Sequence, residues 1–155
     1  MNRDTILQRS DNVTFQTVAG EAILIRMDTG NYFSFNPVGT DFWDLLDGRA
    51  TIAQHATTIA SKYNHKADEL AAAIIALVQK KADARSQQAL ADQYDIEIEF
   101  IQGHLARLTN APAGQELSQY QQAIAEAFYV SPATVQDDLL ELAQTMFADK
   151  LVTVR

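Results

Sequence analysis

Apolar and polar residues alternate near the N-terminal end of the chain with the two-residue period of β-strands. Three segments carry this pattern: residues 13–19, 23–28 and 32–35. Gly20 separates the first segment from the second, and Asp28–Asn31 (DTGN) separates the second from the third. Glycine and asparagine tolerate the positive φ angles of tight turns, so both intervals suit hairpin turns. We therefore expect a three-stranded antiparallel sheet, preceded by a loose arm over residues 1–12.

After the third strand the apolar residues recur at helical spacing. Asn36 suits the N-cap of a helix, and Pro37 suits its first position, where the missing N–H costs nothing. One apolar stripe follows, formed by Val38, Phe42, Leu45 and Leu46. Gly48 is expected to end this helix in the left-handed conformation that glycine adopts without strain.

The rest of the chain is helical in pattern, and part of it is repeated. Thr51 is expected to cap a helix that Asn64–His65 interrupts, and a further helix is expected over about 67–81. Three segments align without gaps, beginning at Ile59, Leu90 and Ile124. Their matched columns are Tyr63, Tyr94 and Phe128; Leu70, Ile101 and Val135; Ile74, Leu105 and Leu139; and Leu77, Leu108 and Leu142. The columns predict three helix–turn–helix units with a repeat of roughly 30 residues.

The third unit has the clearest local signals. Ser131–Pro132 forms a cap and first-position pair, and residues 150–154 are expected to form a short strand. Asn110–Gly114 is the expected linker between units, and Gly103 should weaken the middle unit by roughly 1 kcal/mol relative to Ala. The predicted fold class is α+β and mostly helical: a three-stranded antiparallel sheet, winged-helix-like helices, and repeated helix–turn–helix pairs.

The segment FNPVGTDFWDLLDG resembles the strand-to-helix signature of the PqqD family, the small peptide-binding proteins of coenzyme PQQ synthesis. Related domains act as leader-recognition elements for other modified peptides. The matching residues are Tyr32, Phe33, Phe35, Asn36, Gly39, Trp43, Leu46 and Gly48. The resemblance continues from Thr51 to about Lys80. We therefore expect a PqqD-like peptide-binding domain over 1–81 and two further helix-pair repeats over 82–155.

A three-stranded sheet leaves two open edges, whose N–H and C=O groups an added peptide strand can satisfy. The resemblance implies which edge is used, because in the family the peptide lies along the third strand in a groove closed by a helix. One predicted wall is formed by Asn31, Tyr32, Phe33, Ser34, Phe35 and Asn36. The other predicted wall, from the second helix of the first unit, is formed by Glu69, Ala72, Ala73, Ala76 and Leu77. The alternative is that Phe33 and Phe35 are core residues and that the alanines pack against the second helix pair.

Composition narrows the function further. The chain has no cysteine and a net charge of −8, with carboxylates at the starts of its candidate recognition helices, so DNA binding by a winged helix is disfavoured. The three histidines, His55, His65 and His104, form no metal or catalytic motif, and no phosphate-binding glycine loop is present. We expect no enzyme activity and no cofactor. The polar N-terminus and the lack of a long apolar run predict a cytoplasmic protein without a membrane partner.

The function predicted from these patterns is capture of a precursor or leader peptide by strand addition, for presentation to a modifying enzyme. The resemblance implies a radical SAM enzyme or another peptide-tailoring enzyme as the partner. The acidic helices predict a peptide segment that is neutral or basic and has apolar anchors. The alternatives are a helical-repeat scaffold or a homodimer built by exchange of the repeats, and, less favoured, a DNA-binding regulator.

Overall fold

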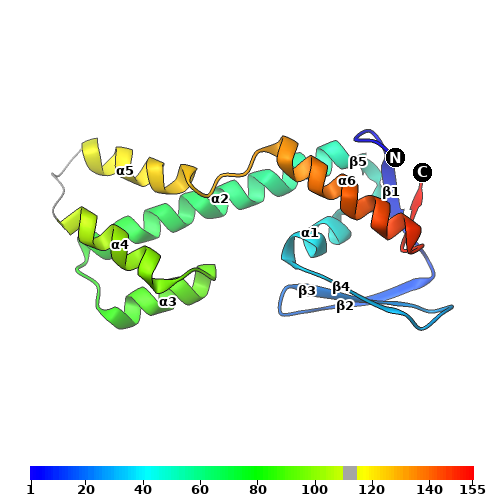
Figure 1. Cartoon of the computed structure of the whole chain (residues 1–155), viewed down its shortest axis with the longest axis horizontal. Helices are drawn as coiled ribbons and strands as arrows, with labels where there is room; N and C mark the ends of the chain where they lie inside the picture. Colours follow the sequence, from blue (N-terminus) through cyan, green and yellow to red (C-terminus); the bar gives the residue numbers. More distant parts are fainter. Residues whose placement is uncertain (110–114) are drawn as a thin grey trace. The chain divides into compact units, whose positions relative to one another are not determined.

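The computed structural model describes residues 1–109 and 115–155 (Figure 1). The expected linker, residues 110–114, lies outside the described residues. The contacts divide the chain into two compact units. The first unit joins Met1–Lys62 to Val130–Arg155, and the second is Tyr63–Tyr129. This division differs from the predicted boundary after residue 81, because the C-terminal segment folds with the N-terminal strands.

The first unit contains the predicted antiparallel sheet. Its strands are β2 (Val13–Val18), β3 (Glu21–Arg26) and β4 (Tyr32–Phe35), in the order β2-β3-β4. Gly20 and Gly30 have φ angles of 81° and 72° in the two connecting turns, the conformation for which glycine is favoured. The three-stranded antiparallel sheet predicted from the sequence is confirmed.

A second sheet in the same unit is formed by residues that are far apart in the sequence. Its strands are β1 (Ile6–Arg9), β5 (Asp47–Thr51) and β6 (Val152–Val154), in the order β5-β1-β6. The predicted terminal strand is therefore present, whereas the loose arm predicted over residues 1–12 is wrong. Leu7 in the central strand is fully buried, and Leu7 pairs with Val154. Strand β1 thus takes one of its two partners from the opposite end of the chain.

Helix α1 (Pro37–Leu45) starts where the sequence indicates. The Asn36 side chain accepts a hydrogen bond from the N–H of Gly39 at 2.8 Å and so caps the helix. The predicted end at Gly48 is wrong, because the helix stops at Leu45 and Gly48, with φ 77°, belongs to β5. Phe42 and Trp43 are fully buried and place α1 in the core of the unit.

Helix α2 (Ile52–Gln79) is longer than expected. It begins with a reciprocal capping box, in which Thr51 Oγ1 accepts from the N–H of Gln54 and Gln54 Oε1 accepts from the N–H of Thr51. The break predicted at Asn64–His65 is wrong, because the helix runs through both residues. Neither residue disfavours a helix by more than about 0.7 kcal/mol, so a continuous hydrogen-bonded helix prevails.

The second unit is helical. It contains the C-terminal part of α2, then α3 (Ala84–Tyr94), α4 (Ile98–Thr109) and α5 (Gln115–Glu126). Its core includes the repeat residues Leu70, Ile74, Leu90, Ile101, Leu108 and Ile124. The last helix, α6 (Pro132–Ala148), belongs to the first unit and is capped by Ser131, as predicted. No helix of residues 1–109 and 115–155 combines the length and apolar character needed to cross a lipid bilayer.

Candidate peptide-binding groove

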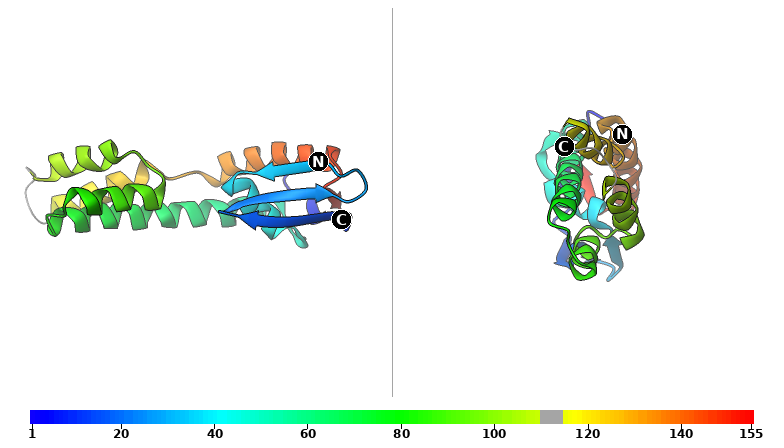
Figure 2. Two further views of the ribbon diagram at one scale, coloured as in Figure 1. Left: turned by 90° about the horizontal axis from the view of Figure 1, so that it is seen from below. Right: turned by 90° about the vertical axis from the view of Figure 1, so that its left-hand side faces the viewer.

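Strand β4 forms one edge of its sheet. In the described part of the chain it pairs only with β3, and Figure 2 shows the three strands side by side. The N–H of Arg26 donates to the C=O of Asn31 at 3.0 Å, and the next cross-strand pairs are Ile25–Tyr32 and Leu24–Phe33. Since hydrogen-bonded and non-hydrogen-bonded pairs alternate in antiparallel sheets, Leu24–Phe33 is a bonded pair. The N–H and C=O groups of Tyr32 and Ser34 therefore point to the open edge.

The side chains of β4 also alternate, as predicted. Tyr32 is 72% exposed and Ser34 is exposed, whereas Phe33 and Phe35 are half-buried. Phe35 packs on Trp43, with ring centroids 6.1 Å apart. Strand β4 is thus anchored through one face, while its outer backbone edge pairs with no other strand of the described residues.

A groove of about 540 Å³ lies beside the end of β4, and α6 forms its opposite wall. The β4–α1 side contributes Ser34, Phe35, Asn36, Val38 and Gly39, and the α6 side contributes Asp138, Leu139, Glu141, Leu142 and Thr145. All of these residues belong to the first unit. An open strand edge next to a groove is the arrangement required for binding an extended peptide.

The closeness of α1, β4 and α6 at this groove depends on Gly39. A Cβ atom at this position would lie 3.0 Å from the Cβ of Phe35 and 3.4 Å from Cδ2 of Leu142. The buried Thr40 fixes the adjacent end of the sheet, because its hydroxyl accepts from the N–H of Ala22 at 2.8 Å and donates to the C=O of Phe35 at 3.2 Å. Two residues that line the groove, Phe35 and Gly39, are therefore held in close contact with their neighbours.

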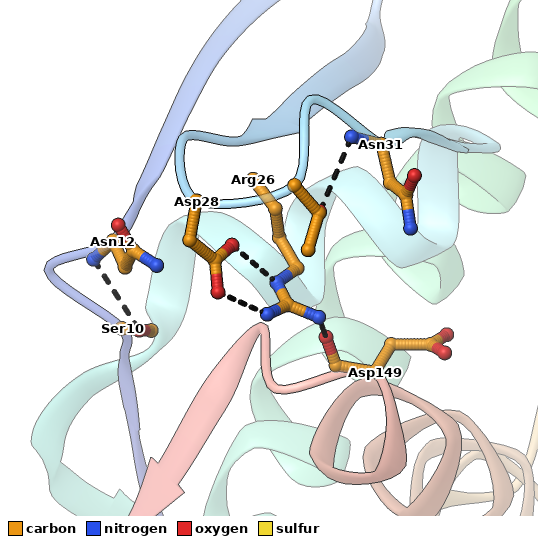
Figure 3. A network of polar contacts seen from close by, with 7 residues as sticks. Ser10, Asn12, Arg26, Asp28, Asn31 and Asp149 are labelled. Atoms are coloured by element: carbon orange, nitrogen blue, oxygen red, sulfur yellow. Dashed lines mark hydrogen bonds and ion pairs between the residues drawn. The ribbon is translucent and has the colours of Figure 1, made fainter.

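Arg26 connects the β3–β4 turn to the C-terminal end of α6 (Figure 3). Its guanidinium makes a two-pronged ion pair with Asp28, with Nε 3.0 Å from Oδ1, and its Nη1 donates to the C=O of Asp149 at 3.3 Å. The hydrogen bond from Arg26 holds the pKa of Asp28 below its ordinary value of 3.8. This contact ties the hairpin that carries β4 to the helix that faces it.

The charge of the groove is entirely negative. Asp138 and Glu141 are its only ionisable lining residues, and both are exposed. No salt bridge recorded among the described residues involves either carboxylate. The same groove also has the apolar lining residues Val38, Leu139 and Leu142.

The structure brings together only part of the predicted site. Ser34, Phe35 and Asn36 line the groove, and Asn31, Tyr32 and Phe33 lie on the same hairpin. The predicted helical wall (Glu69, Ala72, Ala73, Ala76 and Leu77) lies in the second unit instead. There Ala73 and Leu77 pack against the helical core, while Glu69 and Ala72 are exposed. The packing alternative stated for these alanines thus holds for Ala73.

The repeat contains the signal that identifies α6. In the alignment that matches Ile59 with Ile124, Ala73, Ala76 and Leu77 correspond to Asp138, Glu141 and Leu142. These three α6 residues line the groove beside β4. The helical face predicted to line a groove in the first repeat unit therefore corresponds to the face that lines the groove beside β4 in the third unit.

Two buried polar atoms in the first unit have no hydrogen-bond partner among the described residues, Trp43 Nε1 and His55 Nε2. Burial lowers the pKa of His55 below its ordinary value of 6.5, and the nearby charge of Asp47 acts in the opposite direction. Residues 1–109 and 115–155 contain no cluster of three or more His, Asp or Glu side chains placed to hold a metal ion.

Comparison with known proteins finds a family match over a region that contains β4. The comparison with curated proteins finds no match. Among solved structures, TbiB1 in complex with the TbiA(beta) leader peptide is similar at 16% identity and a TM-score of 0.40, over 94% of this chain and 93% of that chain. These values are too low to say anything about the groove. Residues 21–85 match the family model of coenzyme PQQ synthesis protein D (PqqD), so the resemblance seen in the sequence is confirmed and the chain is PqqD-like over this region.

Proposed function

We propose that this protein binds a precursor peptide as an added strand along β4, holds it in the groove between β4 and α6, and presents it to a modifying enzyme. The observation that carries the proposal is the open edge of β4 beside that groove. The PqqD match over residues 21–85 supports it, because the family acts in the synthesis of coenzyme PQQ. A radical SAM enzyme or another peptide-tailoring enzyme is the proposed partner that receives the peptide.

Main-chain pairing alone is too weak for this task. Tyr32 and Ser34 offer two N–H and two C=O groups, and each hydrogen bond contributes about 0.5–1.5 kcal/mol net, or roughly 2–6 kcal/mol together. A micromolar complex needs about 8 kcal/mol after the entropic cost of association has been met. Burial of peptide side chains against Phe35, Val38 and Leu142 must supply the remainder, at about 25 cal/mol per Å² of apolar surface. Affinity should therefore depend on both the strand edge and the groove.

Substitutions at Ser34 separate the backbone from the side chain. Ser34→Pro removes the outward N–H, and proline is tolerated on a free strand edge, so the sheet should remain folded. Ser34→Ala removes the hydroxyl and keeps the N–H. We expect peptides encoded by neighbouring short reading frames to bind the wild type and Ser34→Ala alike, and Ser34→Pro about 2- to 13-fold more weakly, in calorimetric titrations.

Fluorescence of Trp43, the single tryptophan, checks that both Ser34 variants keep the first unit folded. If folded Ser34→Pro and folded Ser34→Ala bind the peptide with equal affinity, binding by strand addition is contradicted.

A further inference from the structure

We propose that the groove is selective for a positively charged peptide strand, in which a Lys or Arg faces Asp138 and Glu141 and a neighbouring apolar residue lies on Leu142 and Val38. This inference rests on the proposed function, and it names the class of peptide that the same groove accepts. The open edge of β4 defines where the peptide lies. The two carboxylates determine which peptide is preferred.

The lining of the groove contains two carboxylates and no Lys, Arg or His. An acidic peptide segment placed there would meet only like charge, whereas a basic segment would form ion pairs. Among the described residues, neither Asp138 nor Glu141 forms a salt bridge. A bound peptide would therefore not have to displace an ion pair between described residues. The net charge of −8 reinforces the preference by attracting basic peptides at long range.

The spacing of these side chains fits one basic residue. Asp138 and Glu141 are three positions apart on α6, so they share a helix face and are separated by roughly 4.5 Å along the axis. In a bound strand, side chains that face the same way recur every roughly 6.8 Å. One long cationic side chain can therefore reach both carboxylates, and the next residue on that face falls beyond them. The methylene stem of Lys or Arg can lie along the α6 wall while its charge remains in water.

Exposed ion pairs are weak individually, so the expected selectivity is moderate. Two such pairs correspond to about a 2- to 30-fold preference for the basic peptide at low salt. The preference should shrink as the salt concentration rises, because the Debye length falls from about 10 Å at 0.1 M to about 3 Å at 1 M. A preference that persists at high salt would need a cause other than these carboxylates.

The test is a selection of random ten-residue peptides displayed on phage against three full-length proteins. These are the wild type, the double variant Asp138→Asn with Glu141→Gln, and the matched control Asp44→Asn with Asp137→Asn. The control raises the net charge by the same amount at exposed positions that do not line the groove. Enriched peptides are then synthesised with Lys, Gln or Glu at the basic position, and their binding is titrated at 50 mM and 500 mM salt.

We expect the wild type and the control to enrich peptides with one Lys or Arg beside an apolar residue, and to bind the Lys peptide about 2- to 30-fold more tightly than the Gln peptide at 50 mM salt. The double variant should lose this preference. If the enriched peptides show no charge preference but bind Ser34→Pro more weakly than the wild type, the proposed selectivity is overturned and strand addition still stands. If no enriched peptide binds Ser34→Pro more weakly than the wild type, both proposals are overturned.

Discussion

At the scale of single residues, we expect His55 to make the stability of the first unit depend on pH. The side chain is 5% exposed, it packs edge-on against Phe42 with ring centroids 5.9 Å apart, and burial lowers its pKa. Between the lowered folded pKa and the ordinary value of 6.5, the unfolded chain binds more protons than the folded chain. The free energy of unfolding should therefore fall as the pH is lowered through about 6.5.

Denaturant titrations followed by Trp43 fluorescence at pH 8, 6.5 and 5.5 measure this dependence. Wild-type protein should lose stability between pH 6.5 and 5.5, and His55→Leu should show a shallower loss because it removes the titrating group. An identical pH dependence in the two proteins would exclude His55 as the cause.

Gly103 offers a second test at this scale. It lies inside α4, and a Cβ atom built on it meets no atom within 4 Å. Gly103→Ala should therefore stabilise the second unit by about 0.5–1 kcal/mol, because alanine favours the helix and causes no clash. Gly30→Ala is the contrasting variant, since Gly30 has a φ angle of 72° and alanine should destabilise the turn there.

Thermal unfolding followed by circular dichroism compares the two glycine variants with the wild type. Destabilisation by Gly103→Ala would show that α4 does not continue through this position as a regular helix.

At the scale of elements, the Arg26 contact holds the β3–β4 hairpin against the end of α6. Arg26→Met keeps much of the side-chain volume and removes both the ion pair with Asp28 and the hydrogen bond to Asp149. We expect a lower denaturant midpoint for the first unit and weaker peptide binding, because the two walls of the groove are then less firmly connected. Asp28→Asn should have the smaller effect, since it retains the contact with Asp149.

The same contact predicts a loss of stability in acid. The pKa of Asp28 is held below 3.8 in the folded protein, so the ion pair stabilises the fold above that pH and is lost as the pH falls through the folded pKa. The difference in midpoint between the wild type and Arg26→Met should shrink below pH 3.8. A constant difference down to pH 2 would contradict this account.

The elements that sequence analysis predicted correctly are those specified by neighbouring residues. The hairpin strands β2, β3 and β4, the cap at Asn36 and the cap at Ser131 all depend on side chains within a few positions. Strand β1 could not be predicted in this way, because both of its partners, β5 and β6, are far from it in the sequence. The wall of the groove presented a different difficulty, since three helices carry the same repeat and only tertiary packing decides which one faces β4.

At the scale of the whole chain, the first unit depends on both ends of the sequence. Besides the smaller Ala143, helix α6 and the residues that follow it contribute four almost fully buried apolar side chains: Leu139, Met146, Leu151 and Val152. Burial of each contributes about 1.5–3 kcal/mol, and the sum is comparable with the total stability of a domain, about 5–15 kcal/mol. A fragment of residues 1–81 should therefore fail to fold, although it contains most of the PqqD match.

Trp43 provides the measurement for this prediction. In a chain that lacks residues 130–155, its emission should shift toward that of exposed tryptophan, and the cooperative transition of the first unit should disappear. Native-like fluorescence from the fragment 1–81 would instead support the domain boundary predicted from the sequence.

Amide hydrogen exchange along β4, with and without peptide, tests the central claim most directly. The N–H groups of Tyr32 and Ser34 point to the open edge, whereas that of Phe33 is paired with β3. Bound peptide should slow exchange at Tyr32 and Ser34 and change Phe33 much less, which gives an alternating pattern of protection. Peptide binding that leaves Tyr32 and Ser34 exchanging at their free rates would contradict capture by strand addition.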